Sequence, residues 1–353
     1  MNGRTLFITG TGALAQAIIE TLSAAPLNDL RVHIYGRNAE RARWLATIGN
    51  ARAASFGRQQ HYAGAAMSWH SERPLSYELQ EFRPFILIHA ASLQSMWTLA
   101  RSNAWSRLVK EVGYGITLPL QCVLAAAIGR TIETMETPPL FINCCYPDAV
   151  NHVLTKNRIK VLCGIGNIGI IESILNAQGV ADFRMLANHV HVQELMKEPG
   201  ERTIFPRVWI DEKEADARTL FNDMRLVNDP SLNSITAAGC IRLLSALVEG
   251  DDALLHLPGP SGLPGGYPVE IRSGCITAVG TGFVAQAEEC AWNAALLERE
   301  GIAFDGEGVR FSEPAFKGLA QYSPALAKGF RFSEMDDYLP GFSSLVQRLL
   351  DKP

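Results

Sequence analysis

The stretch Leu6-Phe7-Ile8-Thr9-Gly10-Thr11-Gly12-Ala13-Leu14-Ala15 decides the fold. Three apolar residues lead into the spacing G-x-G-x-x-(G/A), and a helical run follows. In this context the first glycine makes a tight turn, the second lets the backbone approach a pyrophosphate, and the small third residue packs the helix against the strand. Because the start of a helix attracts phosphates, we expect a dinucleotide at this turn; the alternative is a glycine turn in another α/β fold. The residues expected to contact the dinucleotide are Gly10, Gly12, Ala13, Leu14 and Ala15.

The end of the second expected strand, at residues 31–35, selects the kind of dinucleotide. Gly36-Arg37-Asn38 follows, with no Asp or Glu where a carboxylate usually binds the ribose 2′-hydroxyl of NAD. Gly36 leaves room there, and the guanidinium of Arg37 can pair with a 2′-phosphate. We therefore expect NADP(H) to be favoured over NAD(H), with Arg37, Asn38 and Arg41 at the cofactor. The alternative is that both arginines are solvated charges at a helix start.

Outward from this motif, short apolar runs alternate with helical patterns. The expected strands cover residues 6–8, 31–35, 66–69, 85–88, 140–142 and 161–163, and the longest expected helices cover residues 96–112 and 118–136. Apolar strands separated by helices are typical of a parallel sheet covered on both faces. The expected fold class is α/β, with an N-terminal Rossmann doubly wound parallel sheet in residues 1–166.

After residue 166 the order of elements becomes mixed, which predicts an α+β domain over residues 167–353 for the substrate and for oligomerisation. Its expected strands cover residues 183–195 and 203–210, its hairpin residues 269–279, and its helices residues 168–177, 212–226, 234–249 and 286–300. From Asp305 onward, scattered glycines, prolines and aromatic residues allow no assignment.

Composition excludes several classes of function. The 32 Lys+Arg and 36 Asp+Glu give a net charge of −4, which argues against binding nucleic acid or an anionic membrane through bulk electrostatics. The seven cysteines include no C-x-x-C pair, so neither a disulfide framework nor a standard zinc module is indicated. The sequence begins without the pattern of a signal peptide, and no run of about 18 uncharged apolar residues predicts a membrane span. We expect a cytoplasmic protein.

Three later segments carry a second signal. They are residues 141–150 (FINCCYPDAV), residues 161–169 (VLCGIGNIG) and residues 185–191 (MLANHVH). In order and spacing they resemble the lactate/malate dehydrogenase superfamily, which includes the NAD-dependent family 4 glycosidases. Residues 257–258 and 268–271 resemble a later hairpin of that superfamily. The resemblance implies a lactate/malate dehydrogenase-like second domain and a homodimer or homotetramer, to which the low charged fraction of 19% also points.

Departures from that superfamily bear on metal and substrate. In the glycosidases a cysteine and the histidine hold a divalent metal, but here the cysteine position is Gly166, and Cys163 lies three residues early. We therefore expect no metal site. In the hydroxy-acid dehydrogenases an Asp orients the histidine and an Arg binds the substrate carboxylate. Here Glu172 is a candidate for the Asp position and the Arg is missing, so simple lactate- or malate-type specificity is not expected.

Hydride reduction of a carbonyl or imine needs a proton donor beside the nicotinamide, and a histidine can donate and accept that proton near neutral pH. The Asn-His context makes His189 the expected acid–base, with a satisfied core histidine as the alternative. Asn143 is expected to hydrogen-bond the nicotinamide amide or the substrate oxygen, unless it only caps its strand. Ala90-Ala91-Ser92, at the end of a strand, is expected to lie against the cofactor. Arg101 and Arg107 are candidates for an anionic substrate or are exposed helix charges.

Together these features predict an NADP(H)-dependent oxidoreductase acting on a carbonyl, imine or secondary alcohol of a small polar substrate. One alternative is a glycosidase-like enzyme, in which a transiently reduced nicotinamide and a metal support cleavage by elimination. The other is a non-catalytic dinucleotide-binding sensor. Cys144-Cys145 is expected to be a pair of buried thiols, since the sequence offers no partner that would activate a thiolate.

Overall fold

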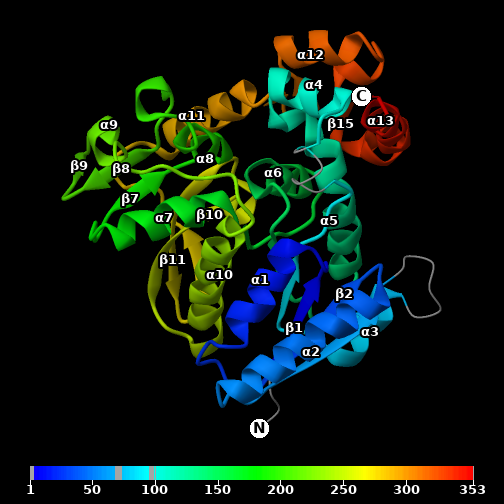
Figure 1. Ribbon diagram of the computed structural model, residues 1–353, viewed down its shortest axis with the longest axis vertical. Coiled ribbons are helices and arrows are strands. Elements are labelled where there is room, and N and C mark those ends of the chain that lie inside the picture. The colour runs from blue at the N-terminus through cyan, green and yellow to red at the C-terminus, as the bar shows by residue number, and fades with distance from the viewer. Residues whose placement is uncertain (1–3, 68–73, 95–98, 100, 353) are drawn as a thin grey trace.

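Figure 1 shows the computed structural model of the chain, which describes residues 4–67, 74–94, 99 and 101–352. Six parallel strands form the central sheet in the order β3-β2-β1-β4-β5-β6. The strands are β1 (Arg4–Thr9), β2 (Leu30–Gly36), β3 (Gln60–Ala66), β4 (Ile86–His89), β5 (Leu140–Asn143) and β6 (Cys163–Gly164). The strand order reverses between β1 and β4, which confirms the expected doubly wound sheet. Such sheets bind ligands at the carboxyl ends of the strands beside this reversal.

Side chains of β1 alternate between the two faces of the sheet, because successive residues of a strand point to opposite sides. Leu6 and Ile8 are buried in one apolar cluster with α1 and α2, whereas Phe7 is buried in a second cluster with α4, α5 and α6. The helices of this half are α1 (Ala13–Leu22), α2 (Ala39–Ser55), α3 (Leu75–Phe82), α4 (Ala104–Val112), the 3-10 helix η2 (Tyr114–Thr117), α5 (Leu118–Glu133) and α6 (Pro147–Lys156).

The next part of the chain builds two small antiparallel sheets, β7-β8-β9 and β10-β11-β12. Its helices are α7 (Asn167–Ala177), α8 (His189–Leu195), η3 (Pro199–Glu201), α9 (Ala217–Leu220), α10 (Leu232–Glu249), η4 (Pro260–Gly262) and α11 (Gln286–Arg299). Its strands are β7 (Arg184–Leu186), β8 (Arg207–Ile210), β9 (Lys213–Glu214), β10 (Ala253–Pro258), β11 (Gly266–Arg272) and β12 (Cys275–Ala278). The expected hairpin and the expected helices at 234–249 and 286–300 are therefore confirmed.

The C-terminal segment, which the sequence left unassigned, is folded. Its elements are β13 (Ile302–Phe304), β14 (Gly308–Phe311), α12 (Glu313–Ala320), η5 (Leu326–Lys328), β15 (Phe330–Arg331), η6 (Phe332–Glu334) and α13 (Met335–Leu350). We call β13 to α13 the C-terminal cap. Figure 1 shows it beside α4, and α12 and α13 both pack on that helix.

The second half of the chain covers both faces of the sheet. Helix α10 packs against α1 on one side, as Figure 1 also shows, and the β10–β11 hairpin joins the same cluster. On the other side, Phe342 and Leu349 of α13 are buried in the cluster that contains Phe7. The two halves therefore share their apolar cores. The domain boundary expected at residue 166, two residues after β6, stays a prediction.

The strand expected over residues 183–195 is wrong in its second half. β7 ends at Leu186, and α8 begins at His189 after the N-cap residue Asn188. The backbone N–H of Asn188 donates to Nδ1 of His191 at 2.8 Å, a contact across the first turn of a helix. His189 and His191 therefore do not share one face, as alternate residues of a strand would.

Other expected elements are shifted or shorter. The third strand ends at Ala66, before most of the expected span, and residues 68–69 lie outside the described residues. The helix expected from residue 96 begins at Ala104, because the side chain of Asn103 accepts from the backbone N–H of Ser106 and caps it there. Residues 96–98 and 100 lie outside the described residues. The helix expected over residues 212–226 is reduced to the four residues of α9.

Within the part of the chain that the structure describes, two stretches are long and apolar enough to cross a membrane by length and composition alone: residues Tyr114–Glu133 and helix α10. The first lies mostly buried in the cluster that contains Phe7. In α10, the residues Leu243 and Leu247 are buried against the other face of the sheet. Both helices therefore have a packing role in this fold.

Candidate active site

The turn between β1 and α1 has the geometry that the glycine pattern predicts. Gly10 has a φ of 126°, and a Cβ there would lie 2.3 Å from the carbonyl oxygen of Ala90, so only glycine allows this close approach of the β1 and β4 ends. A Cβ on Gly12 would meet no atom within 4 Å, and no side chain caps α1. Ala13 is exposed at the start of the helix, whereas Ala15 is buried. The first N–H groups of α1 are thus left for an anion, which fits the pyrophosphate of a dinucleotide.

The end of β2 carries the residues expected to select the cofactor. The side chain of Asn38 caps α2 by accepting from the backbone N–H of Arg41 at 2.9 Å, and the guanidinium of Arg41 donates to a glutamine of α1. Arg37 is exposed, and no partner of its guanidinium is seen among the described residues. The space expected above Gly36 is filled by Thr11, since a Cβ at Gly36 would lie 2.6 Å from the methyl group of that side chain.

The end of β4 lies beside this turn. The backbone N–H of Ala90 donates to Thr9 of β1, and the carbonyl oxygen of Ala91 accepts from the thiol of Cys145 at 3.1 Å. The hydroxyl of Ser92 donates to the backbone of its own loop. Nδ1 of the buried His89 lies 2.9 Å from the hydroxyl of Thr9, and burial lowers the pKa of His89 to about 3, so this ring is neutral. The roles expected of residues 90–92 at the cofactor stay predictions.

The amide of Asn143 is bonded within the protein through both its nitrogen and its oxygen. Its Oδ1 accepts from the backbone N–H of Cys145 at 2.9 Å, and its Nδ2 donates to the carbonyl oxygen of Cys145 and to the side chain of Asn151. These bonds hold the turn that follows β5. Nδ2 has two acceptors, whereas Oδ1 has one donor and keeps a second lone pair, and the expected role of Asn143 stays a prediction.

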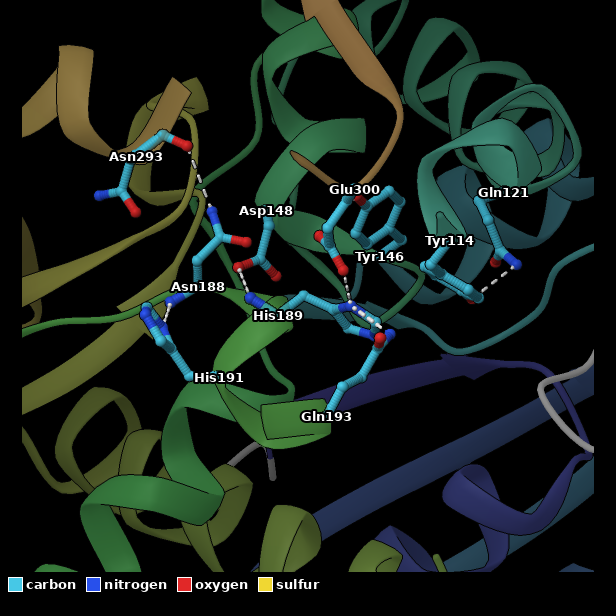
Figure 2. A network of polar contacts seen from close by, with 10 residues as sticks. All are labelled: Tyr114, Gln121, Tyr146, Asp148, Asn188, His189, His191, Gln193, Asn293 and Glu300. Atoms are coloured by element: carbon cyan, nitrogen blue, oxygen red, sulfur yellow. Dashed lines mark hydrogen bonds and ion pairs between the residues drawn. The ribbon is translucent and has the colours of Figure 1, made fainter. Parts of the chain in front are cut away.

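His189 is surrounded by buried acidic groups (Figure 2). Its backbone N–H donates to Oδ1 of Asp148, on α6, at 3.0 Å. Its Nδ1 lies 2.5 Å from Oε1 of Glu300, the residue that ends α11. Because a carboxylate can only accept, Nδ1 donates in this contact and carries a proton. Among the described residues no partner of Nε2 is seen, so this nitrogen remains for a ligand.

Two tyrosines hold the imidazole ring between them. Tyr114, on η2, stacks on it with ring centroids 4.6 Å apart, and Tyr146, just before α6, meets it edge-on at 5.2 Å. The hydroxyl of Tyr114 accepts from the amide of Gln121 at 3.2 Å. The amide of Gln193 lies 3.4 Å from Nδ1 of the histidine, on the side that Figure 2 shows below the ring.

The carboxylates set the charge of the histidine. Burial opposes protonation of His189, but attraction by Glu300 and Asp148 outweighs it and raises the pKa of His189 above its ordinary value of 6.5. Burial also raises the pKa of Asp148 to about 6, although the charge of His189 acts in the opposite direction. The imidazolium is therefore more populated near neutral pH than it is for an ordinary histidine.

The position of Glu300 is fixed by the backbone. Its carbonyl oxygen accepts from the N–H of Gly115 in η2 at 2.7 Å. A Cβ on Gly113, which has a φ of 107°, would lie 2.1 Å from this oxygen. Glycine at residue 113 thus lets α11 and the C-terminal cap approach η2 and brings Glu300 to the histidine.

Other residues singled out in the sequence lie elsewhere. Glu172 is paired with His256 at 3.2 Å and with Arg242 at 3.3 Å, so it does not orient His189. Arg101 and Arg107 are exposed. Three further polar side chains near these segments have local structural roles: His191 closes the first turn of α8, Asn167 begins α7, and Cys144 is packed in the cluster that contains Ile8.

Sequence reasoning missed four side chains around the histidine: Tyr114, Tyr146, Asp148 and Glu300. Residues 146 and 148 lie within the segment that carried the resemblance, but nothing in it indicated their burial. Glu300 lies 111 residues from His189 and reads as an ordinary charge at the end of a helix. Burial of both partners could not be read from the sequence.

No group of three or more His, Cys, Asp or Glu side chains within the described ranges is placed to hold a metal ion. Burial raises the pKa of the Cys145 thiol to about 12 and that of the Cys144 thiol well above its ordinary value. Both thiols are therefore protonated, and neither is a nucleophile near neutral pH.

Comparison with known proteins identifies the fold. No protein-family model and no curated protein matches the sequence. The malate dehydrogenase of Archaeoglobus fulgidus in complex with NADH matches 84% of this chain and 98% of its own length, with a TM-score of 0.55 and 16% identity. The apo malate dehydrogenase of Picrophilus torridus matches 84% and 96%, with a TM-score of 0.57 and 10% identity. The minor L-lactate dehydrogenase of Enterococcus mundtii matches 84% and 97%, with a TM-score of 0.53 and 12% identity.

Proposed function

Because this chain has the fold of malate and lactate dehydrogenases, we propose that it is an oxidoreductase that uses a nicotinamide dinucleotide, with His189 as the general acid–base. The observation that carries the proposal is the buried pair of His189 and Glu300. A histidine whose Nδ1 is held by a carboxylate presents Nε2 to a ligand in one defined tautomer. This arrangement suits repeated proton exchange with a substrate oxygen or nitrogen.

Each part of the chain has a task in this proposal. The turn at Gly10 and Gly12 and the start of α1 bind the pyrophosphate. The nicotinamide, when bound, supplies or accepts the hydride. Protonated His189 donates a proton from Nε2 to a carbonyl or imine in the reducing direction, and the neutral ring accepts it in the oxidising direction. Glu300 stabilises the charged ring.

We further infer that NADP(H) is preferred over NAD(H). The exposed Arg37 follows β2, where a ribose 2′-phosphate would lie, and the nearest helix begins with Asn38 rather than with a carboxylate. The substrate is a small polar carbonyl, imine or secondary alcohol, and the protein works in the cytoplasm as a homodimer or homotetramer.

Titration of purified protein with NADPH and NADH, followed by the fluorescence of the reduced nicotinamide, tests the proposal. Both should bind, NADPH more tightly. Arg37→Ala should weaken NADPH by about tenfold, as expected for the loss of a charge-assisted hydrogen bond, and leave NADH unchanged. Arg348→Ala, which removes the same charge from α13 in the C-terminal cap, is the matched control. Binding of neither cofactor contradicts the function, and tighter binding of NADH contradicts the preference.

A further inference from the structure

The carboxylate that holds His189 has a second buried partner, which the proposed chemistry does not use. Oε2 of Glu300 accepts from the hydroxyl of Tyr146 at 2.9 Å, while Oε1 accepts from His189 (Figure 2). The exposed fractions of Tyr146 and Glu300 are 5% and 3%. Each carboxylate oxygen thus has one protein donor, and the orientation of the carboxylate plane is set from both sides.

The backbone at Tyr146 is strained. Its φ of 43° and ψ of 55° lie in the left-handed region, which residues other than glycine rarely adopt. Tyr146 is the last residue before α6, which begins at Pro147, and its phenol donates to Glu300. Glycine would adopt this backbone without strain, but it has no hydroxyl to reach the carboxylate. Strain of this kind persists where the surrounding structure holds a side chain in place for function.

The titratable groups that face the histidine come from four places in the fold. They are Glu300 at the end of α11, Asp148 on α6, Tyr146 before α6 and Tyr114 on η2. Gln193 of α8 is an uncharged neighbour. Among the described residues, two side chains hydrogen-bond to the Glu300 carboxylate: His189 at Oε1 and Tyr146 at Oε2.

We propose that Tyr146 is a positioning residue, whose hydroxyl orients the Glu300 carboxylate and limits how strongly that carboxylate attracts the imidazolium of His189. The tyrosine hydroxyl donates to Glu300, while its ring packs edge-on against the imidazole. It tunes the proton affinity of the histidine through Glu300, so that Nε2 can both release and recover its proton. This inference rests on the proposed acid–base role of His189.

The direction of the effect follows from charge. The Tyr146 hydroxyl donates a hydrogen bond to the carboxylate and stabilises its negative charge, so the carboxylate attracts the imidazolium less strongly. Without the hydroxyl this stabilisation is lost, and the ion pair between Glu300 and His189 strengthens. A stronger ion pair favours the protonated ring. Tyr146→Phe should therefore raise the pKa of His189, by about one unit for the loss of one hydrogen bond to a charged group.

The test is an NMR titration of protein labelled with ¹⁵N-histidine, in which His189→Gln assigns the signal. Four variants form the comparison: Tyr146→Phe, Glu300→Gln, the double variant, and Tyr114→Phe. The last removes a hydroxyl that lies beside the same ring but is bonded to Gln121. Tyr146→Asn, which tolerates the left-handed backbone, replaces Tyr146→Phe if the latter does not fold.

We expect a rise of about one pKa unit in Tyr146→Phe, no rise when the same change is added to Glu300→Gln, and no rise in Tyr114→Phe. An unchanged or lowered pKa in folded Tyr146→Phe overturns the inference, as does an equal rise in the Glu300→Gln background. The titration needs no substrate. If the pKa of His189 rises in Tyr146→Phe but the protein binds no nicotinamide dinucleotide, the proposed function is contradicted and this inference stands. If the protein binds the dinucleotide but the pKa does not rise, this inference is contradicted and the proposed function stands.

Discussion

Three buried histidines show how the surroundings of a side chain change its pKa. Burial lowers the pKa of His89 to about 3, and it lowers that of His191 to about 3 as well, because a charged ring is disfavoured away from water. His189 is buried too, yet its pKa is raised. The difference is the pair of carboxylates, since Glu300 and Asp148 contact His189 directly. Of these three residues, His189 is therefore the one whose surroundings favour the protonated ring.

The raised pKa predicts how stability depends on pH. A group whose folded pKa is raised stabilises the fold fully below its unfolded pKa of 6.5, and this contribution is lost as the pH rises through the folded value. Glu300→Gln removes the partner, so it should destabilise the protein by about 3–5 kcal/mol at pH 6, and by less at pH 9. Urea unfolding at both pH values measures this. Glu313→Gln, which breaks an exposed pair with Lys317, should change stability by less than about 1 kcal/mol at either pH. An equal cost of Glu300→Gln at pH 6 and pH 9 would contradict the ion pair.

At the scale of elements, the sequence predicted structure that depends on neighbouring residues, but not contacts between residues far apart in the chain. The β1–α1 turn is specified by glycines within a few residues of each other, and its geometry follows from sterics, so the sequence predicted it. Residues 183–195 were expected to form one strand, but the side chain of His191 closes a helical turn there. Glu300 ends a correctly expected helix, and its partner is 111 residues away, so no local pattern could connect the two.

Two alanine substitutions in the β1–α1 turn separate folding from cofactor binding. Gly10→Ala should lower the free energy of unfolding by about 1–3 kcal/mol or more, because the positive φ and the carbonyl oxygen of Ala90 exclude a side chain. Gly12→Ala should change stability by less than about 0.5 kcal/mol, since its φ is −77° and the space around it is open. The added methyl group should also weaken NADPH binding, because the proposed function places the pyrophosphate against the backbone of residue 12. Urea unfolding and nicotinamide fluorescence measure the two effects, and a fully stable Gly10→Ala would contradict this account of the turn.

At the scale of the whole molecule, the C-terminal cap joins the sheet to the site. Phe342 of α13 is fully buried and meets Trp105 of α4 edge-on, with ring centroids 6.0 Å apart. Helix α4 leads directly into η2, which carries Tyr114 and receives the carbonyl oxygen of Glu300. The cap therefore supports the elements that surround the histidine. Its strands are two to four residues long, too short for a periodic pattern. In α13 the residues Phe342, Leu345 and Leu349 have helical spacing, but Pro340 lies inside the helix and argues against one in the sequence.

Replacing the buried Phe342 by alanine tests whether the C-terminal cap stabilises the fold. Phe342→Ala should cost about 3–5 kcal/mol of unfolding free energy, as expected for a large-to-small change in a packed core. Phe316→Ala, on α12 with an exposed fraction of 40%, is the matched control and should cost less than about 0.5 kcal/mol. Calorimetry on both variants gives the comparison. Equal effects of the two substitutions would show that the cap does not belong to the core.

The central claim is that His189 exchanges a proton beside a nicotinamide bound at the carboxyl ends of the strands. A crystal structure with NADPH tests it most directly. We predict the pyrophosphate on the backbone N–H groups at the start of α1, and the C4 atom of the nicotinamide within about 7 Å of Nε2 of His189, which leaves room for one reacting group between them. A nicotinamide ring bound away from His189, or no dinucleotide at saturating concentration, would contradict the account.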